Sequence, residues 1–132
     1  MDSVDFQRWR SSLQKYFLSF DGAAKGNPAA ARGGGILVDP DGLIKLSYSW
    51  GLEVHTNNTA EALALWKGLN QSLCLNVHDL VVFGDSRLII QSLVTHRLPK
   101  QLKLWHILEK IKILLSSFHF AQFFHVLRDL NA

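Results

Sequence analysis

Three carboxylates occupy positions from which a sheet-forming chain could bring them together. Asp21 follows an apolar run that begins at Tyr16, Asp85 follows the run DLVVFG, and Glu61 lies near the start of a helix-forming segment between them. Carboxylates that converge repel one another unless a cation lies between them. The chain has a single cysteine and no histidines at metal-ligand spacing, so this oxygen ligand set indicates Mg²⁺, with Mn²⁺ possible, rather than zinc.

Such a site could hydrolyse a phosphodiester, because paired divalent ions provide an activated water and stabilise the leaving oxygen. Each acid also has a simpler structural interpretation. Asp21 could form an Asp-Gly turn, and Asp85 could cap a helix. Glu61 stands three residues after Asn58, the spacing of a capping box. The chemical interpretation requires that all three side chains meet.

The elements that must position these acids follow from the hydrophobic pattern. Strands are expected at residues 16–21, 33–38, 43–50, 79–84 and 119–127, and helices at 58–73, 86–94 and 102–115. Asp39-Pro40-Asp41-Gly42 should form the turn of a β-hairpin, and residues 22–32 should form a loop. Residues 1–14 could form a short helix or a leader. This order predicts an α/β fold with an antiparallel hairpin joined to parallel strands by helical crossovers.

In such a sheet, neighbouring parallel strands present their carboxyl ends at one edge, where α/β sheets usually place their sites. Asp21 and Asp85 should therefore approach each other if their strands are neighbours. Glu61 can join them only if the first turn of its helix faces that edge.

The composition sets the broad class. The 132 residues suit one domain, and the formal net charge of +3 slightly favours an anionic partner. A single cysteine, Cys74, excludes an internal disulfide and suits a reducing compartment. No apolar run is long enough for a membrane span, and Asp2 and Asp5 argue against a presequence. We therefore expect a soluble, intracellular, monomeric protein without a membrane partner.

Four motifs, FDGAAKGNP, TNNTAEALAL, GDSRLIIQSL and HVLRDLNA, resemble in order and spacing the type 1 ribonuclease H family, and most closely its plant-type, retrotransposon-related version. The resemblance covers about residues 15–132. It implies a ribonuclease H-like fold, with a mixed five-stranded sheet in the order 3-2-1-4-5, strand 2 antiparallel, flanked by helices. It also implies two-metal-ion hydrolysis of the RNA strand of RNA·DNA hybrids, with Mg²⁺ as the cofactor.

The resemblance assigns roles to particular residues. Asp21, Glu61 and Asp85 match the first three metal-binding, catalytic acids of the family. The residues that match its nucleic-acid-binding positions are Gly22, Lys25, Asn27, Asn57, Asn58, Ser86 and Arg87. Amide side chains and backbone-exposing turns suit an A-like minor groove that displays 2′-hydroxyls. Asn58 could instead cap its helix, and Arg87 could simply be exposed.

The chain also departs from the family. It ends at Asn131-Ala132, before the fourth acid and the closing helix, so the resemblance predicts a missing C-terminal helix and impaired catalysis. The alternative function is therefore a hybrid-binding module without turnover, or a retroelement-derived fragment. Arg32 stands where the family usually has a small residue, in the expected loop. His125 is interpreted as a strand residue.

Overall fold

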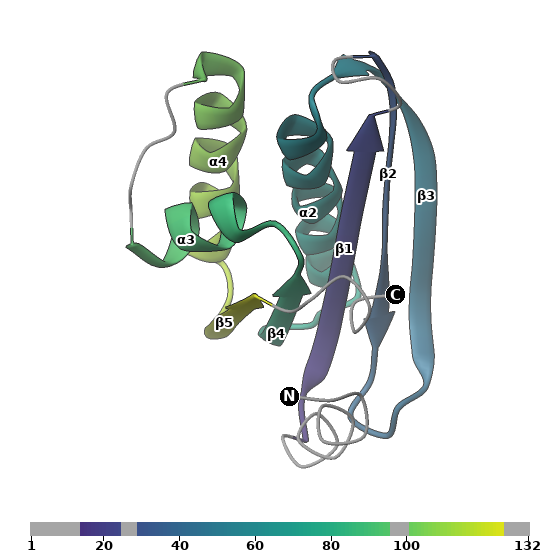
Figure 1. The fold of residues 1–132 in the computed structure, drawn as a ribbon. Coiled ribbons are helices and arrows are strands. Elements are labelled where there is room, and N and C mark those ends of the chain that lie inside the picture. The colour runs from purple at the N-terminus through teal and green to yellow at the C-terminus, as the bar shows by residue number, and fades with distance from the viewer. Residues whose placement is uncertain (1–13, 25–28, 96–100, 126–132) are drawn as a thin grey trace.

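The computed structural model describes residues 14–24, 29–95 and 101–125. Their elements, in chain order, are β1 (Tyr16–Ala24), β2 (Ala29–Val38), β3 (Ile44–His55), α2 (Asn57–Cys74), β4 (Asp79–Gly84), α3 (Arg87–Thr95), α4 (Leu102–Leu115) and β5 (Phe120–His125). The strands form one sheet in the order β3-β2-β1-β4-β5 (Figure 1). Residues 1–13, which include most of the expected leader or helix, lie outside the described residues.

The topology confirms the predicted fold. β1 pairs antiparallel with β2, and β2 pairs antiparallel with β3. β1 is parallel to β4, and β4 is parallel to β5. The pairing between β1 and β4 is short and runs from Tyr16 opposite Leu80 to Ser19 opposite Phe83. β1 continues alongside β2 as far as Ala24, which lies opposite Ala31.

The expected loop over residues 22–32 is wrong at both ends. β1 extends to Ala24 and β2 begins at Ala29, so Arg32 is a strand residue that pairs with Ala23 and Gly51. Glycine and alanine have low intrinsic strand propensity and gave no alternating pattern. The backbone ladder between neighbouring strands extends this hairpin beyond what the side chains indicate.

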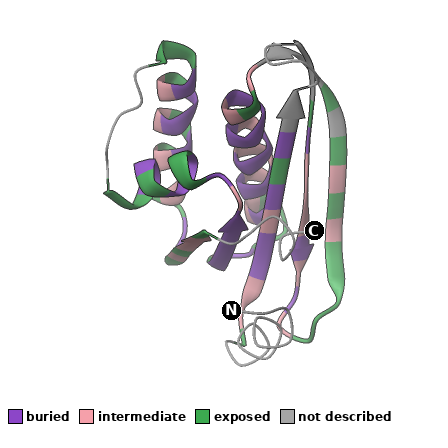
Figure 2. Cartoon of the chain, viewed as in Figure 1, coloured by how far each residue is buried: buried purple, intermediate pink, exposed green. Residues whose placement is uncertain are grey.

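The main core lies between the sheet and its helices. α2 packs on β1 and β2, and α4 packs beside α2 on the same side of the sheet (Figure 1). Figure 2 shows the buried flank of α2 and the almost wholly buried strand β4. On the opposite face, Phe17, Val81 and Phe83 are also buried, and the rings of Phe17 and Phe83 stack with centroids 5.6 Å apart. None of the helices in the described ranges has the length and apolar character of a membrane span.

The predicted hairpin turn is confirmed. Asp39 accepts hydrogen bonds at Oδ1 from the backbone N–H groups of Asp41 and Leu43, and Gly42 adopts the positive φ of 88° that the turn requires. The hydrogen bond from Leu43 lowers the pKa of Asp39, and the nearby Lys45 ammonium adds to this effect. The turn therefore fixes the register of β2 against β3.

Tyr48 links β3 to α2. Its hydroxyl donates a hydrogen bond of 2.7 Å to the carbonyl of Ala64, and burial raises the pKa of Tyr48 well above its usual range. Gly35 and Gly68 leave room for the phenol, because a Cβ at either position would lie within 2.4 Å of the Tyr48 hydroxyl oxygen. This bond therefore fixes the height of α2 above the hairpin.

Replacing Tyr48 with phenylalanine should lower the free energy of unfolding by about 1 kcal/mol, because the substitution removes a largely buried hydrogen bond without creating a cavity. Urea denaturation followed by circular dichroism would measure the loss. Tyr16→Phe is the matched control. The Tyr16 hydroxyl makes no hydrogen bond to the described residues, so its loss should be smaller. Equal effects of the two substitutions would contradict the role of the Tyr48 bond.

Candidate metal-binding active site

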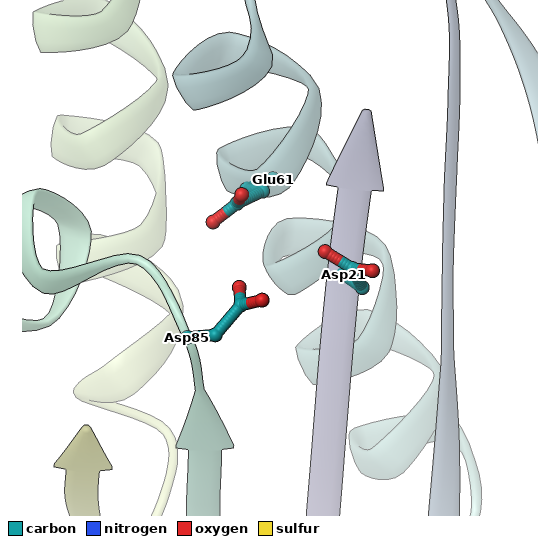
Figure 3. Close-up of side chains that lie close together, drawn as sticks. All are labelled: Asp21, Glu61 and Asp85. Atoms are coloured by element: carbon teal, nitrogen blue, oxygen red, sulfur yellow. The ribbon is translucent and has the colours of Figure 1, made fainter. Parts of the chain in front are cut away.

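Asp21, Glu61 and Asp85 meet at the edge of the sheet just beyond the point where the pairing of β1 with β4 ends. Each offers a carboxylate oxygen, and these three atoms lie within 4.8 Å of one another (Figure 3). Asp21 is exposed, Asp85 is half-buried, and Glu61 is only 7% exposed. The predicted convergence of the three acids is therefore confirmed.

Asp21 lies within a strand rather than in a turn. β1 continues to Ala24, and Asp21 pairs with Gly34 of β2. Its Oδ1 accepts a hydrogen bond of 2.9 Å from the N–H of Gly22. The Asp-Gly turn is therefore wrong, and the strand holds this carboxylate on the sheet face opposite α2.

The helix that carries Glu61, α2, begins one residue earlier than expected. Thr56 is the N-cap, and its hydroxyl oxygen accepts a hydrogen bond of 3.3 Å from the N–H of Thr59. A capping box from Asn58 to Glu61 is therefore wrong, and Glu61 lies in the second turn of the helix rather than the first. Gly22 permits this placement, because a Cβ on Gly22 would lie 2.4 Å from Ala60 C and from Glu61 N. The backbones of β1 and α2 thus touch beside Glu61.

Asp85 is not the cap of α3. Ser86 has that role, with its Oγ accepting a hydrogen bond of 3.4 Å from the N–H of Ile89, so Asp85 stands between strand and helix. Its carbonyl oxygen lies 3.1 Å from Nε2 of His125, at the end of β5. The sequence identified His125 only as a strand residue. The contact depends on the pairing of Gly84 with His125, which the hydrophobic pattern does not specify.

The cluster fits a hard divalent cation. Its donors are carboxylate oxygens from three elements, with no histidine or cysteine, and it is the one such group among the described residues. Glu61 is buried beside the two other acids. Converging carboxylates repel one another unless a cation lies between them. This donor set agrees with ions that prefer oxygen ligands and disagrees with a structural zinc site.

The predicted nucleic-acid-binding residues divide into surface and interior groups. Asn57 and Arg87 are exposed at the starts of α2 and α3. Asn58 is half-buried, and its Oδ1 accepts a hydrogen bond of 3.4 Å from the hydroxyl of the buried Ser86. This bond joins the starts of the two helices next to Glu61 and Asp85. Gly22 is buried against α2, and Lys25 and Asn27 lie outside the described residues.

Comparisons with known proteins agree with this architecture. The family described as reverse transcriptase-like matches residues 19–132. Ribonuclease HI of Halobacterium salinarum is 38% identical over 74 residues, which is 56% of this chain but only 37% of that protein. The crystal structure of ribonuclease H1 from Halobacterium salinarum is 31% identical with a TM-score of 0.84, and the match covers 89% of each chain.

A second similar structure was solved with a bound nucleic acid. LC11 ribonuclease H1, in complex with an RNA/DNA hybrid, is 27% identical with a TM-score of 0.83 and 89% coverage of each chain. The N-terminal ribonuclease H domain of a Mycobacterium tuberculosis protein is 25% identical, with a TM-score of 0.84 and coverage of 89% of this chain and 90% of that one. Each of these three solved structures matches 89% of this chain.

Proposed function

Because the chain belongs to the type 1 ribonuclease H family, we propose that it hydrolyses the RNA strand of RNA·DNA hybrids at the edge formed by Asp21, Glu61 and Asp85. The observation that carries this proposal is the meeting of the three carboxylates within 4.8 Å, just beyond the point where the parallel pairing of β1 with β4 ends. The relative solved with an RNA/DNA hybrid supports the choice of substrate.

The three acids have different positions and therefore different roles. Asp21, which is exposed, faces the arriving phosphate, and Asp85 faces it from the end of β4. Glu61 is buried and held by the close contact of α2 with Gly22, so it fixes the inner side of the site. Divalent ions held by this set, Mg²⁺ in our proposal, would supply an activated water and stabilise the leaving oxygen. The products would be a 3′-hydroxyl and a 5′-phosphate.

The surface around the acids would position the hybrid. Asn57 presents an exposed amide at the start of α2, suited to ribose hydroxyls and base edges of an A-like minor groove. Arg87, exposed at the start of α3, would contact a phosphate. Ser86 and Asn58 would hold these two helix starts at a fixed separation through their hydrogen bond. Gly22, Lys25 and Asn27 complete the proposed contact set.

A cleavage assay tests the proposal directly. An RNA·DNA duplex with labelled RNA should yield shortened RNA with Mg²⁺ or Mn²⁺ and no product with EDTA. Single-stranded RNA and double-stranded DNA of the same sequence should remain intact. Hybrid binding without product in either metal would contradict catalysis and favour a binding module. The absence of both binding and product would contradict the proposed function altogether.

Metal binding should also stabilise the fold, because a cation removes the repulsion within the cluster. At a Mg²⁺ concentration ten times Kd, the stabilisation should be about 1.4 kcal/mol, and the midpoint of thermal unfolding should rise by several degrees. Differential scanning calorimetry at constant ionic strength would measure the rise. The same titration of an Asp21→Asn variant should give a much smaller shift. Equal shifts would show that Mg²⁺ acts elsewhere on the protein.

A further inference from the structure

A trough lies on the sheet face opposite α2, next to the acid cluster. Its volume is about 370 Å³, and its lining includes Asp21, Arg32 and Gly34. Three serine hydroxyls also line it, from Ser19, Ser47 and Ser49. Because Asp21 belongs both to the trough and to the cluster, the two are continuous.

The register of the three strands explains why few side chains fill this trough. Asp21 pairs with Gly34, which in turn pairs with Ser49, so the residue beside the carboxylate has no side chain. The next residue of β2 on this face is Arg32, which pairs with Gly51. A Cβ on Gly51 would meet nothing within 4 Å. Gly34 thus presents no side chain beside Asp21, although a Cβ there would lie 2.6 Å from the Tyr48 carbonyl oxygen. Gly51 leaves open space beside Arg32.

Arg32 is the positively charged residue that lines the trough. Its side chain is exposed and makes no ion pair with another described residue. It stands diagonally across from Asp21, at a Cβ separation of about 7 Å for such pairs. A guanidinium offers a planar set of donors that binds phosphate through two hydrogen bonds. The arrangement therefore places a phosphate-binding group one diagonal step from the acids.

We propose that this trough is a phosphate subsite for the cleaved strand, in which Arg32 pairs with a phosphate next to the scissile one. The proposal rests on the proposed function, because it takes an RNA·DNA hybrid as the ligand. The RNA strand is favoured over the DNA strand because the trough shares Asp21 with the site of cleavage. The serine hydroxyls beside Arg32 supply donors and acceptors for the same nucleotide.

The salt dependence of hybrid binding provides the test. Fluorescence anisotropy with a labelled RNA·DNA duplex, in EDTA to prevent turnover, would give the binding constant from about 50 to about 200 mM KCl. Arg32→Gln should reduce the slope of log K against log salt by about 0.9, because one phosphate contact is lost. Arg32→Lys should largely keep the slope. Lys110→Gln, at an exposed position on α4, is the control of equal charge change and should also keep it.

A second variant tests the trough itself. Gly51→Asp places a carboxylate beside Arg32 without a steric clash and should weaken hybrid binding, whereas Gly51→Ser should not. If Arg32→Gln leaves the slope unchanged while the wild type binds hybrids, the subsite is wrong and the proposed function stands. If the wild type binds no hybrid, both proposals fail.

Neutral methylphosphonate linkages identify the strand that Arg32 contacts. One such linkage at the matching RNA phosphate should abolish the difference between the wild type and Arg32→Gln, because the contact is then absent from both. Linkages in the DNA strand should leave the difference intact. Loss of the difference with a DNA-strand linkage alone would overturn the assignment to the cleaved strand.

Discussion

Replacing Asp85 with asparagine is expected to abolish hybrid cleavage while leaving the protein at least as stable as the wild type. Asparagine keeps the shape of the side chain but removes the negative charge that a divalent ion requires. Changes to residues that merely support metal ligands commonly cost about 10- to 100-fold in affinity or activity, so loss of a ligand should exceed about 100-fold. Stability should not fall, because one of three mutually repelling charges disappears.

Single-turnover cleavage in Mg²⁺ and thermal unfolding in EDTA would measure the two effects of Asp85→Asn. Asp79→Asn is the matched control, since Asp79 is an exposed carboxylate at the opposite end of β4. It undergoes the same change of charge and should keep full activity. Cleavage by Asp85→Asn within tenfold of the wild type would remove Asp85 from the mechanism.

Replacing Gly22 with alanine should impair both folding and cleavage. The added Cβ would lie 2.4 Å from two backbone atoms of α2, and neither can move without shifting the helix. Such overpacking typically costs about 1 to 3 kcal/mol. The shift would also carry Glu61 away from Asp21 and Asp85, so cleavage should fall even in the fraction of the protein that remains folded.

Urea denaturation and cleavage well below the melting temperature would separate the two consequences of Gly22→Ala. Gly51→Ala is the control, because a Cβ at that position meets nothing within 4 Å. It should preserve both stability and cleavage. A Gly22→Ala protein with wild-type stability would show that the contact between β1 and α2 is looser than the structure indicates.

The sheet order and the meeting of the three acids were both predicted from the sequence. They depend on the order of the apolar segments, on the four motifs and on the position of each acid relative to these segments. β4 was predicted with its observed bounds, Asp79–Gly84, since a short apolar run between polar residues is typical of an interior strand. The four motifs supplied the order of the remaining strands. These predictions required no knowledge of the register.

Features that depend on register could not be predicted. The trough brings together Asp21 of β1, Arg32 and Gly34 of β2 and Ser49 of β3, and only the pairing of three strands places these residues side by side. Asn58 was considered as the cap of α2, whereas Thr56 caps the helix, because the position of the cap depends on where the backbone leaves β3. The plant-type assignment and the weakened catalysis remain predictions.

The pairing of β1 with β4 ends at Ser19 and Phe83. Asp21 and Asp85 each follow two residues after this last pair. From there β1 stays with β2, and β4 stays with β5 as far as Gly84. The sheet therefore splits into two parts beyond this point. Asp21 lies on the part formed by β1 and β2, and Asp85 follows the part formed by β4 and β5. An ion bound between Asp21 and Asp85 would therefore cross-link the antiparallel strands β1 to β3 with the parallel strands β4 and β5.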